Sequence, residues 1–496
     1  MTKGEAPVQD DPIGVIVIPP FLKYAAGPLL GPATLVGAAQ SAGMNVISLD
    51  LNIDFIQSAV ATPAEGIKQP IFYGDHSKQG FLERAERKFW NEILLAFGYD
   101  SRASLSDIKR GWYTHSELAE AAERMLGQNL GEFLRVEFRR EAPCRLFGVS
   151  VMWAGQVPPA LVLSKIAKSE WPGVKVVWGG AHVTALAAEI AKDAEFGSWV
   201  DGFLPFHCEG SFVELLTSVS RGEFACTGLI IPGSGIVRER PISIIPPPSP
   251  IFTNVKGYGY PKLMLPIELS VGCPYAKCTF CTYPAVEGSY VKFPLEGLHR
   301  TVELAMKGGA AISFKDSLLP TPMLRAIALV VGGRVEWSAC TKLSPGLDAD
   351  TLSLLARNGC RTLEVGLESL NLEAQRRIDK IQPIELLDEF LTSASSAGIS
   401  VVVNYITGFP WESPVEAERL LQWLKEHMKG FEGLVARVEH NHFNLERLSP
   451  MAVQPERYGL KITQGWPWSS ILRWEPASGV VPSECPMASK LTIGRD

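Results

Sequence analysis

Cys273-Pro-Tyr-Ala-Lys-Cys278-Thr-Phe-Cys281 is the stretch on which the interpretation of this sequence depends. Its three cysteines lie within nine residues, after the apolar run 263–271, which predicts a short strand that ends at a turn. Thiolates are soft ligands that select zinc or iron–sulfur clusters, and such sites usually have four of them. A local group of three predicts a [4Fe–4S] cluster with one iron open to a non-protein ligand. The alternatives are a zinc site completed by a distant residue, or buried cysteines.

The composition limits the class of protein. A chain of 496 residues is long enough for two or three domains. The net charge of −6 gives no basic footprint for nucleic acid, and no run is apolar and long enough to cross a bilayer. The first twelve residues do not resemble a signal peptide, and nine scattered cysteines do not suit a disulfide framework. We therefore expect a cytoplasmic protein without nucleic-acid or membrane partners.

Residues 1–245 are predicted to form a first α/β domain. Helical segments separate apolar runs that predict strands, and this order favours a parallel, doubly wound sheet. The predicted strands are 13–18, 45–49, 144–151, 174–178 and 200–206. Residues 53–142 interrupt the order with helical spacing, so we expect a mainly helical insertion there. Ligands of such sheets bind at the carboxyl ends of the strands, so the loops that follow the strands form the candidate site.

A proline-rich stretch at 241–250 is stiff and marks a domain boundary. Beyond it, strand and helix patterns alternate six times within 251–445, which predicts a second parallel α/β domain. Residues 446–496 are expected to form a C-terminal extension. We expect its tryptophans to close over the mouth of the second domain or to form the wall of a substrate site; they are Trp466, Trp468 and Trp474.

The cysteine motif resembles the cluster motif of the radical S-adenosylmethionine (radical SAM) superfamily. The common family spacing is three residues and then two, whereas this chain has four and then two, a variant that occurs in the superfamily. The resemblance implies that Cys273, Cys278 and Cys281 ligate a [4Fe–4S] cluster whose open iron is chelated by the amino and carboxylate groups of SAM. It also implies that residues 251–445 form a partial (βα)6 TIM-type barrel, with the cysteine loop at its carboxyl face.

The same resemblance places SAM contacts at the ends of the other barrel strands. Asp316 is the candidate for the SAM ammonium, with a helix cap as the alternative. Glu368 is the candidate for the ribose hydroxyls, with an ion pair to Arg376 or Arg377 as the alternative. Lys342 is considered for the SAM carboxylate, with a surface lysine as the alternative. The predicted SAM-binding residues are Phe280, Asp316, Ser317, Ser338, Glu368, Asn404 and Gly408.

A second resemblance covers the first domain. Residues 148–153, 175–184 and 201–210 look like the cobalamin-binding domain that precedes many radical SAM domains. In such domains a Gly-Gly pair lets the backbone approach the cofactor. The Asp-x-His-x-x-Gly motif, whose histidine ligates cobalt in many cobalamin proteins, is absent after the first strand. The resemblance therefore implies cobalamin bound without a protein histidine, and the alternative is a domain of this type that binds no cofactor.

The predicted cobalamin-binding residues follow the strands of the first domain. For the histidine among them, a contact to a ribose or phosphate and a helix-capping role are both open. The residues are Ser150, Trp153, Gly179, Gly180, His182, Glu209 and Gly210.

Together the two resemblances imply a cobalamin-dependent radical SAM C-methyltransferase. A 5′-deoxyadenosyl radical would remove a hydrogen atom from the substrate, and methylcobalamin would supply the methyl group. The alternatives are rearrangement or ring formation without net methylation, methyl transfer without hydrogen abstraction, and a non-catalytic iron–sulfur or corrinoid-binding protein. Expected partners are a small-molecule or peptide substrate and an electron donor such as flavodoxin or ferredoxin. No side chain is predicted to act as an acid, base or nucleophile.

Overall fold

A computed structural model of the chain describes residues 12–21, 27–60, 80–99, 102–235, 250–252, 255, 258 and 262–477. The chain divides into two compact units, Met1–Pro261 with Trp466–Ser469, and Lys262–Gly465 with Ser470–Asp496. The proline-rich stretch that we interpret as a domain boundary lies outside the described residues, apart from its last residue. Among the helices of the described part, none is both long and apolar enough to span a membrane.

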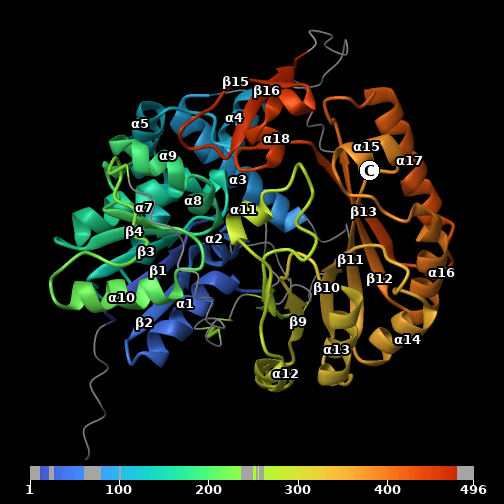
Figure 1. The fold of residues 1–496 in the computed structure, drawn as a ribbon. Helices are drawn as coiled ribbons and strands as arrows, with labels where there is room; N and C mark the ends of the chain where they lie inside the picture. Colours follow the sequence, from blue (N-terminus) through green and yellow to red (C-terminus); the bar gives the residue numbers. More distant parts are fainter. Residues whose placement is uncertain are drawn as a thin grey trace, which may run out of the picture. The chain divides into compact units, whose positions relative to one another are not determined.

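The first unit is built on a five-stranded parallel sheet (Figure 1). Its strands are β1 (Gly14–Ile18), β2 (Val46–Asp50), β3 (Leu146–Ser150), β4 (Lys175–Gly179) and β5 (Gly202–Leu204). Their order is β2-β1-β3-β4-β5. This is the order of a doubly wound, flavodoxin-like sheet, in which the direction of winding reverses between β1 and β3 and ligands bind at that switch point.

Helices cover both faces of this sheet, and β1 shows why its sequence is almost wholly apolar. Val15 and Val17 lie in one core, which includes α7 (Val157–Glu170), whereas Ile16 lies in a second core with α1 (Leu30–Ser41) and α10 (Glu209–Ser220). Successive side chains of a strand point to opposite faces, so a strand covered on both sides needs an unbroken apolar run. The remaining short helices of this unit are η2 (Ala154–Gln156), α8 (Ala181–Ala185), α9 (Ala187–Lys192) and η3 (Ala194–Gly197).

The helical insertion predicted between the second and third strands is present. Its helices are α2 (Leu51–Val60), α3 (Gly80–Phe97), α4 (Arg102–Arg110), α5 (His115–Leu126) and α6 (Asn129–Phe138). A capping box between Thr114 and Glu117 begins α5, because each side chain satisfies the backbone N–H of the other residue. The buried faces of α3, α5 and α6 join the core that contains α7.

The second unit is built on a six-stranded parallel sheet. Its strands follow one another in chain order: β6 (Met264–Ile267), β9 (Ala311–Phe314), β10 (Trp337–Thr341), β11 (Cys360–Glu368), β12 (Ser400–Thr407) and β13 (Ala436–His442). The longer helices between them are α12 (Glu296–Gly308), α13 (Thr321–Val331), α14 (Ala349–Arg357), α16 (Leu387–Ala397) and α17 (Pro414–Lys429), and the shorter ones are α11 (Tyr283–Glu287), α15 (Leu372–Arg377) and η4 (Ile384–Leu386). The predicted six-fold alternation is therefore confirmed. A small ribbon, β7 (Ser270–Val271) with β8 (Val291–Lys292), follows β6.

The C-terminal extension adds a small antiparallel sheet to the second unit, formed by β14 (Leu445–Glu446), β15 (Leu460–Gln464) and β16 (Ile471–Pro476). Trp474 is buried there in a core with Phe443. The expectation that the tryptophans close over the mouth of the second domain or form the wall of a substrate site is wrong for Trp468. Trp466 and Trp468 belong to the first unit, where Trp468 is buried in the core beside α7.

The loops that follow β1 and β3 are joined by the buried amide of Gln156. Its Oε1 accepts hydrogen bonds from the backbone N–H groups of Met152 and Trp153, at 2.7 and 3.3 Å. Its Nε2 donates to the carbonyl oxygen of Pro19 at 3.0 Å. One fully buried side chain therefore fixes both loops at the switch point of the first sheet.

Replacing Gln156 with leucine keeps the side-chain volume but leaves buried backbone groups without partners. We expect the free energy of unfolding to fall by about 2–4 kcal/mol, because each unsatisfied buried group costs about 1–3 kcal/mol. Urea unfolding of the cofactor-free protein measures this loss. Gln422→Leu, at an exposed position on α17, is the control and should change the free energy by less than about 0.5 kcal/mol. Equal effects of the two substitutions would contradict the proposed role of Gln156.

Candidate functional site

The three cysteines lie on one loop of the second unit, between β7 and α11 (Tyr283–Glu287). All three side chains are partly exposed. Gly272 begins the loop with a φ of 72°, and a Cβ at this position would lie 2.8 Å from the carbonyl oxygens of Gly288 and Ser289. Only glycine fits this turn, which follows the first parallel strand of the sheet at its carboxyl end.

Asp316 fixes the segment that leads into the cysteine loop. Its carboxylate is 1% exposed and accepts hydrogen bonds from the Leu269 N–H, at 3.1 and 3.2 Å, and from the Ser270 hydroxyl at 2.6 Å. Burial raises the pKa of Asp316 to about 6, although these hydrogen bonds oppose the rise. It is not a helix cap, because α13 begins at Thr321. A contact with the SAM ammonium remains a prediction for this residue.

Two further hydrogen bonds hold the first residue of the loop. The backbone N–H of Gly272 donates to the buried Glu287 carboxylate at 3.0 Å. The Ser317 hydroxyl donates to the Gly272 carbonyl at 2.7 Å, so this predicted SAM contact already has a partner within the protein. The entrance to the loop is therefore anchored from both β9 and α11.

The far side of the loop is anchored on the end of α15 (Leu372–Arg377). The carbonyl oxygens of residues 377 and 378 accept from the hydroxyl and the N–H of Thr279, at 3.1 and 2.9 Å. The carbonyl oxygen of residue 379 accepts from the Tyr275 hydroxyl at 2.9 Å. Helix ends leave carbonyls without intrahelical partners. The cysteine loop satisfies three of them, on both sides of Cys278.

A buried ion pair lies directly after this anchor. The Lys380 ammonium donates to the Glu368 carboxylate at 2.6 Å, and the two side chains are 15% and 9% exposed. Burial lowers the pKa of Lys380, but the charge and hydrogen bond of Glu368, together with the thiols of Cys278 and Cys281, raise it above its ordinary value. The alternative partners expected for Glu368 were Arg376 and Arg377, which instead pair with Glu373.

A second lysine, Lys342, lies close to the same loop. Its ammonium is 4.2 Å from the centre of the Tyr275 ring, within the range of a cation–π contact. Burial lowers its pKa, and the charge of Lys380 lowers it further. Lys342 is therefore a half-buried residue of the site rather than a surface lysine, and the two ammonium groups place positive charge beside the cysteines.

The remaining residues predicted to bind SAM lie on or after strands of the same sheet. Asn404 on β12 donates to the Glu364 carboxylate at 2.8 Å, and Ser338 on β10 is partly exposed. Gly408 follows β12 with a φ of 86°, and its N–H donates to Glu412 at 2.8 Å. The ring of Phe280 packs 6.1 Å from that of Phe409. Gly408 follows β12 at the carboxyl edge of the sheet, the edge from which the cysteine loop also leaves. Ser338 is only the second residue of β10, so the prediction that it lies at the carboxyl end of its strand is wrong.

The residues predicted to bind cobalamin lie at the carboxyl edge of the first sheet. The loops after β3 and β4 pack together, since Val151 N–H donates to the Gly179 carbonyl at 2.8 Å. Gly180 has a φ of 102°, and a Cβ there would lie 2.5 Å from the Val151 carbonyl oxygen. Only glycine fits at position 180, because a side chain there would collide with the backbone of Val151 whether or not a cofactor is bound. Trp153, in the same edge, keeps 47% of its surface exposed.

Three other predicted residues of this set differ in their surroundings. Glu209 and Gly210 begin α10, and the space around Gly210 is open. His182 is instead 5% exposed, and its Nε2 lies 3.1 Å from the Trp468 carbonyl oxygen. A carbonyl only accepts, so Nε2 carries the proton. Burial lowers the pKa of His182 to about 4, and the ring is neutral at ordinary pH. Its bond to Trp468 is neither of the two roles expected for it.

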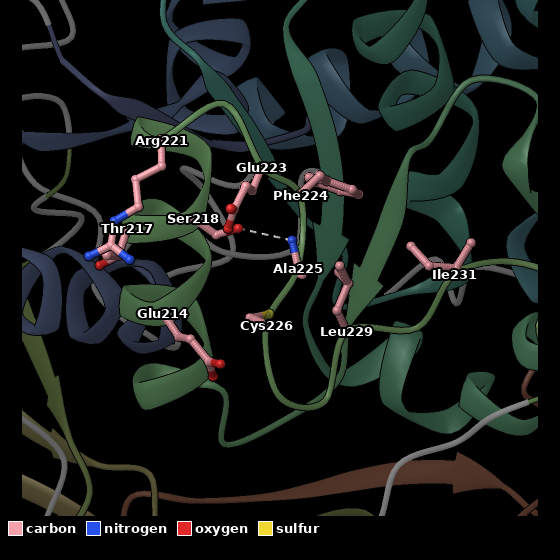
Figure 2. Close-up of a pocket in the computed structure, with 10 residues that line it drawn as sticks. All are labelled: Glu214, Thr217, Ser218, Arg221, Glu223, Phe224, Ala225, Cys226, Leu229 and Ile231. Atoms are coloured by element: carbon pink, nitrogen blue, oxygen red, sulfur yellow. Dashed lines mark hydrogen bonds between the residues drawn. The ribbon is translucent and has the colours of Figure 1, made fainter.

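A pocket in the first unit lies away from these residues. Figure 2 shows that it is formed by the second half of α10 and the segment that follows, where Ser218 accepts from the Ala225 N–H at 3.1 Å. The end of α10 lies at the amino edge of the sheet, because Arg145, which precedes β3, donates to the Ser220 carbonyl. We therefore assign this pocket no part in the candidate site.

The three cysteine thiols of the loop are soft donors of the kind that ligate iron–sulfur clusters. Within the described ranges, no three His, Cys, Asp or Glu side chains lie close enough to share one ion. A tetrahedral zinc site needs its ligands around one centre, whereas each cysteine of a [4Fe–4S] cluster binds a different iron. Three thiols on one loop can each bind one iron of such a cluster and leave the fourth iron to another ligand.

Residues 267–424 match the family model of the Radical SAM superfamily. This span contains the three cysteines and strands β9 to β12. The second unit therefore carries a radical SAM domain, whose cofactors are a [4Fe–4S] cluster and SAM.

Two curated relatives are methyltransferases. The chain is 26% identical over 298 residues to an uncharacterized methyltransferase of Pyrococcus horikoshii, a match that covers 54% of this chain and 61% of the relative. It is 25% identical over 254 residues to the bacteriochlorophyllide d C-12(1)-methyltransferase of Chlorobaculum tepidum, covering 49% and 52%. The chain thus spans between half and two thirds of the length of these relatives.

Two solved structures share the fold over almost the whole chain. The radical SAM methyltransferase TsrM from Kitasatospora setae, solved with cobalamin and a [4Fe–4S] cluster, has a TM-score of 0.58 and 16% identity, covering 92% of this chain and 81% of TsrM. The cobalamin-dependent SAM radical enzyme OxsB has a TM-score of 0.55 and 13% identity, covering 94% and 64%. The predicted fold class, an N-terminal Rossmann-like domain followed by a radical SAM barrel, is confirmed.

Replacing Asp316 with asparagine keeps an acceptor but removes the buried charge. The pKa of about 6 lies above the ordinary 3.8, so the wild-type carboxyl favours the folded state most below pH 4 and loses this advantage as the pH rises to about 6. Between pH 4 and 7.5, we expect the free energy of unfolding of the wild-type protein to fall by about 3 kcal/mol more than that of Asp316→Asn. Urea unfolding of the cluster-free proteins from pH 4 to 7.5 measures it, and a constant difference over this range would contradict the account.

Proposed function

We propose that this chain is a cobalamin-dependent radical SAM methyltransferase that transfers a methyl group to a carbon atom of its substrate. The observation that carries the proposal is the three-cysteine loop at the carboxyl end of β6, inside the radical SAM domain. The relatives whose names specify methyltransferases, and the fold shared with TsrM and OxsB, support it.

In the second unit, the side chains around the loop suit the two cofactors of a radical SAM domain. When bound, the reduced cluster and SAM supply the radical that removes a hydrogen atom from the substrate. Cys273, Cys278 and Cys281 would each hold one iron. Lys342 and Lys380 provide positive charge that stabilises both thiolate-ligated iron and a carboxylate such as that of SAM. Glu368, the ion-pair partner of Lys380, is an acceptor for hydroxyl or ammonium groups.

In the first unit, the carboxyl edge of the sheet is the proposed site for cobalamin. Gln156 fixes the two switch-point loops, and the exposed indole of Trp153 offers an apolar surface beside them. Ser150 and Gly210 lie at the same edge. The Nε2 of His182 already donates to Trp468, which supports the expectation of cobalamin bound without a histidine ligand from this loop.

The proposed substrate is a small molecule or a peptide, and a flavodoxin or ferredoxin is the proposed electron donor. The printed names of the relatives and solved structures illustrate the range: one relative acts on a bacteriochlorophyllide, and TsrM has been solved with tryptophan. Another relative, the methylthiotransferase RimO of Chlorobium phaeobacteroides, is 26% identical over 191 residues, covering 34% of this chain and 43% of RimO. Methyl transfer to carbon is therefore the part of the proposal that needs a direct test.

The test uses anaerobically reconstituted protein, cobalamin, a reductant and SAM labelled in its methyl group, with the small-molecule fraction of the source cells as substrate. We expect a product that carries the label on carbon, together with 5′-deoxyadenosine. The Cys278→Ala variant should form neither, because it lacks one cluster ligand. Deoxyadenosine without labelled product would point to rearrangement, and neither compound from the wild-type protein would point to a binding protein; both results contradict the proposal.

A further inference from the structure

We propose that residues Trp466–Ser469, called here the tryptophan strap, are a positioning element for the cobalamin edge of the first unit, and that His182 is the residue that holds them. The strap comes from the C-terminal extension. The chain leaves the second unit after Gly465 and returns to it at Ser470, and the four residues between belong to the first unit. The inference rests on the proposed function, because it assigns the strap to the edge where cobalamin would bind.

The side chain of Trp468 is an integral part of the first unit. It is 4% exposed, and its ring centre lies 4.5 Å from that of Phe196, 5.3 Å from that of His115 and 5.7 Å from that of Trp178. Trp178 is a residue of β4, so the indole reaches the core beneath the sheet. An aromatic ring buried to this extent anchors the segment that carries it.

The backbone of the strap is held as closely as the ring. The Trp468 carbonyl accepts from His182 Nε2, and a Cβ on Gly111 would lie 2.3 Å from the same oxygen. The Ser469 hydroxyl donates to the Arg110 carbonyl. The Trp466 ring stacks on Trp112 at 4.7 Å with an interplanar angle of 13°. Polar and apolar contacts therefore fix three of the four residues.

His182 links the strap to the loops of the proposed cobalamin site. It lies two residues after Gly180, and its backbone N–H donates to the Val151 carbonyl at 3.2 Å, whereas its ring holds the strap. On the other side of the strap, a Cβ on Gly111 would lie 3.1 Å from the Cβ of Ala154. Ala154 is the residue next to Trp153. The strap is therefore linked to the segment after β4 by His182 and to the segment after β3 by Gly111, which lies between Trp468 and Ala154.

This arrangement gives His182 a role that differs from a cofactor ligand. A positioning residue acts through the group that it holds, so its loss should loosen the loops even though it does not touch cobalamin. Both loops belong to the carboxyl edge, where a shift of about 1 Å is enough to weaken a preorganised site. Release of the strap should consequently weaken cobalamin binding and expose the strap to proteases.

The test compares His182→Phe and Trp468→Ala with Trp474→Ala, in the full-length protein. Trp474 is a matched control, since it is a buried tryptophan of the same extension that packs in the second unit. Absorbance titration with hydroxocobalamin should give a Kd at least tenfold higher for the first two variants and within about twofold of wild type for Trp474→Ala. Limited proteolysis should cut near residues 466–469 in the first two variants only.

His182→Gln keeps a side-chain donor and should recover most of the affinity that His182→Phe loses, which separates the hydrogen bond from the packing of the ring. Far-UV circular dichroism identifies any variant that fails to fold, and the His182→Phe and His182→Gln pair then decides the result. Wild-type affinity in both His182→Phe and Trp468→Ala would overturn this inference alone. A wild-type protein that binds no cobalamin would overturn the proposed function together with it.

Discussion

The hydrogen bonds that hold the cysteine loop at both ends are the constraint on which the candidate active site depends. On one side, buried Asp316 and Glu287 fix the segment that ends at Gly272. On the other side, the end of α15 accepts three hydrogen bonds from Tyr275 and Thr279. The four residues between the first two cysteines are therefore part of an anchored loop, and thiol positions set by the fold need little rearrangement when a metal binds.

The same anchor explains why charged groups collect beside the loop. Lys380 follows the carbonyls that accept from the loop, so the contacts that place the cysteines also place this ammonium and its partner Glu368. Two buried charges are tolerated when they pair closely, and breaking such a pair is costly. Lys342 adds a second positive charge near the thiols. A thiolate-bound cluster and the carboxylate of SAM are both anionic, and both suit this environment.

Much of the fold could be predicted because it depends on local patterns. The apolar run of β1, the helical spacing of the insertion and the six-fold alternation of the second unit all report periodicity, which a sequence displays directly. The cysteines could be found because three of them fall within nine residues. Lys380 was missed, since its approach to the cysteine loop depends on hydrogen bonds at the end of a helix roughly a hundred residues further along the chain. No spacing rule reports a contact of this kind.

His182 and Trp468 illustrate the same limit more strongly, because 286 residues separate them. The Gly-Gly-Ala-His stretch indicates a cofactor loop and the tryptophans indicate a wall of the barrel, but neither pattern contains a sign of the other. The sequence shows only that Asp316 lies at the end of a predicted strand. The two groups that donate to its carboxylate, the Leu269 N–H and the Ser270 hydroxyl, lie about 46 residues earlier in the chain. Only the folded chain reveals these contacts.

The central claim is that the cysteine loop holds a [4Fe–4S] cluster with one iron that no protein side chain ligates. Mössbauer spectroscopy of the anaerobically reconstituted, iron-57-enriched protein, recorded with and without SAM, tests this claim most directly. The account predicts four irons per chain and a change in the signal of one iron alone when SAM is added. A centre that contains zinc, or a cluster whose spectrum is the same with and without SAM, would contradict it.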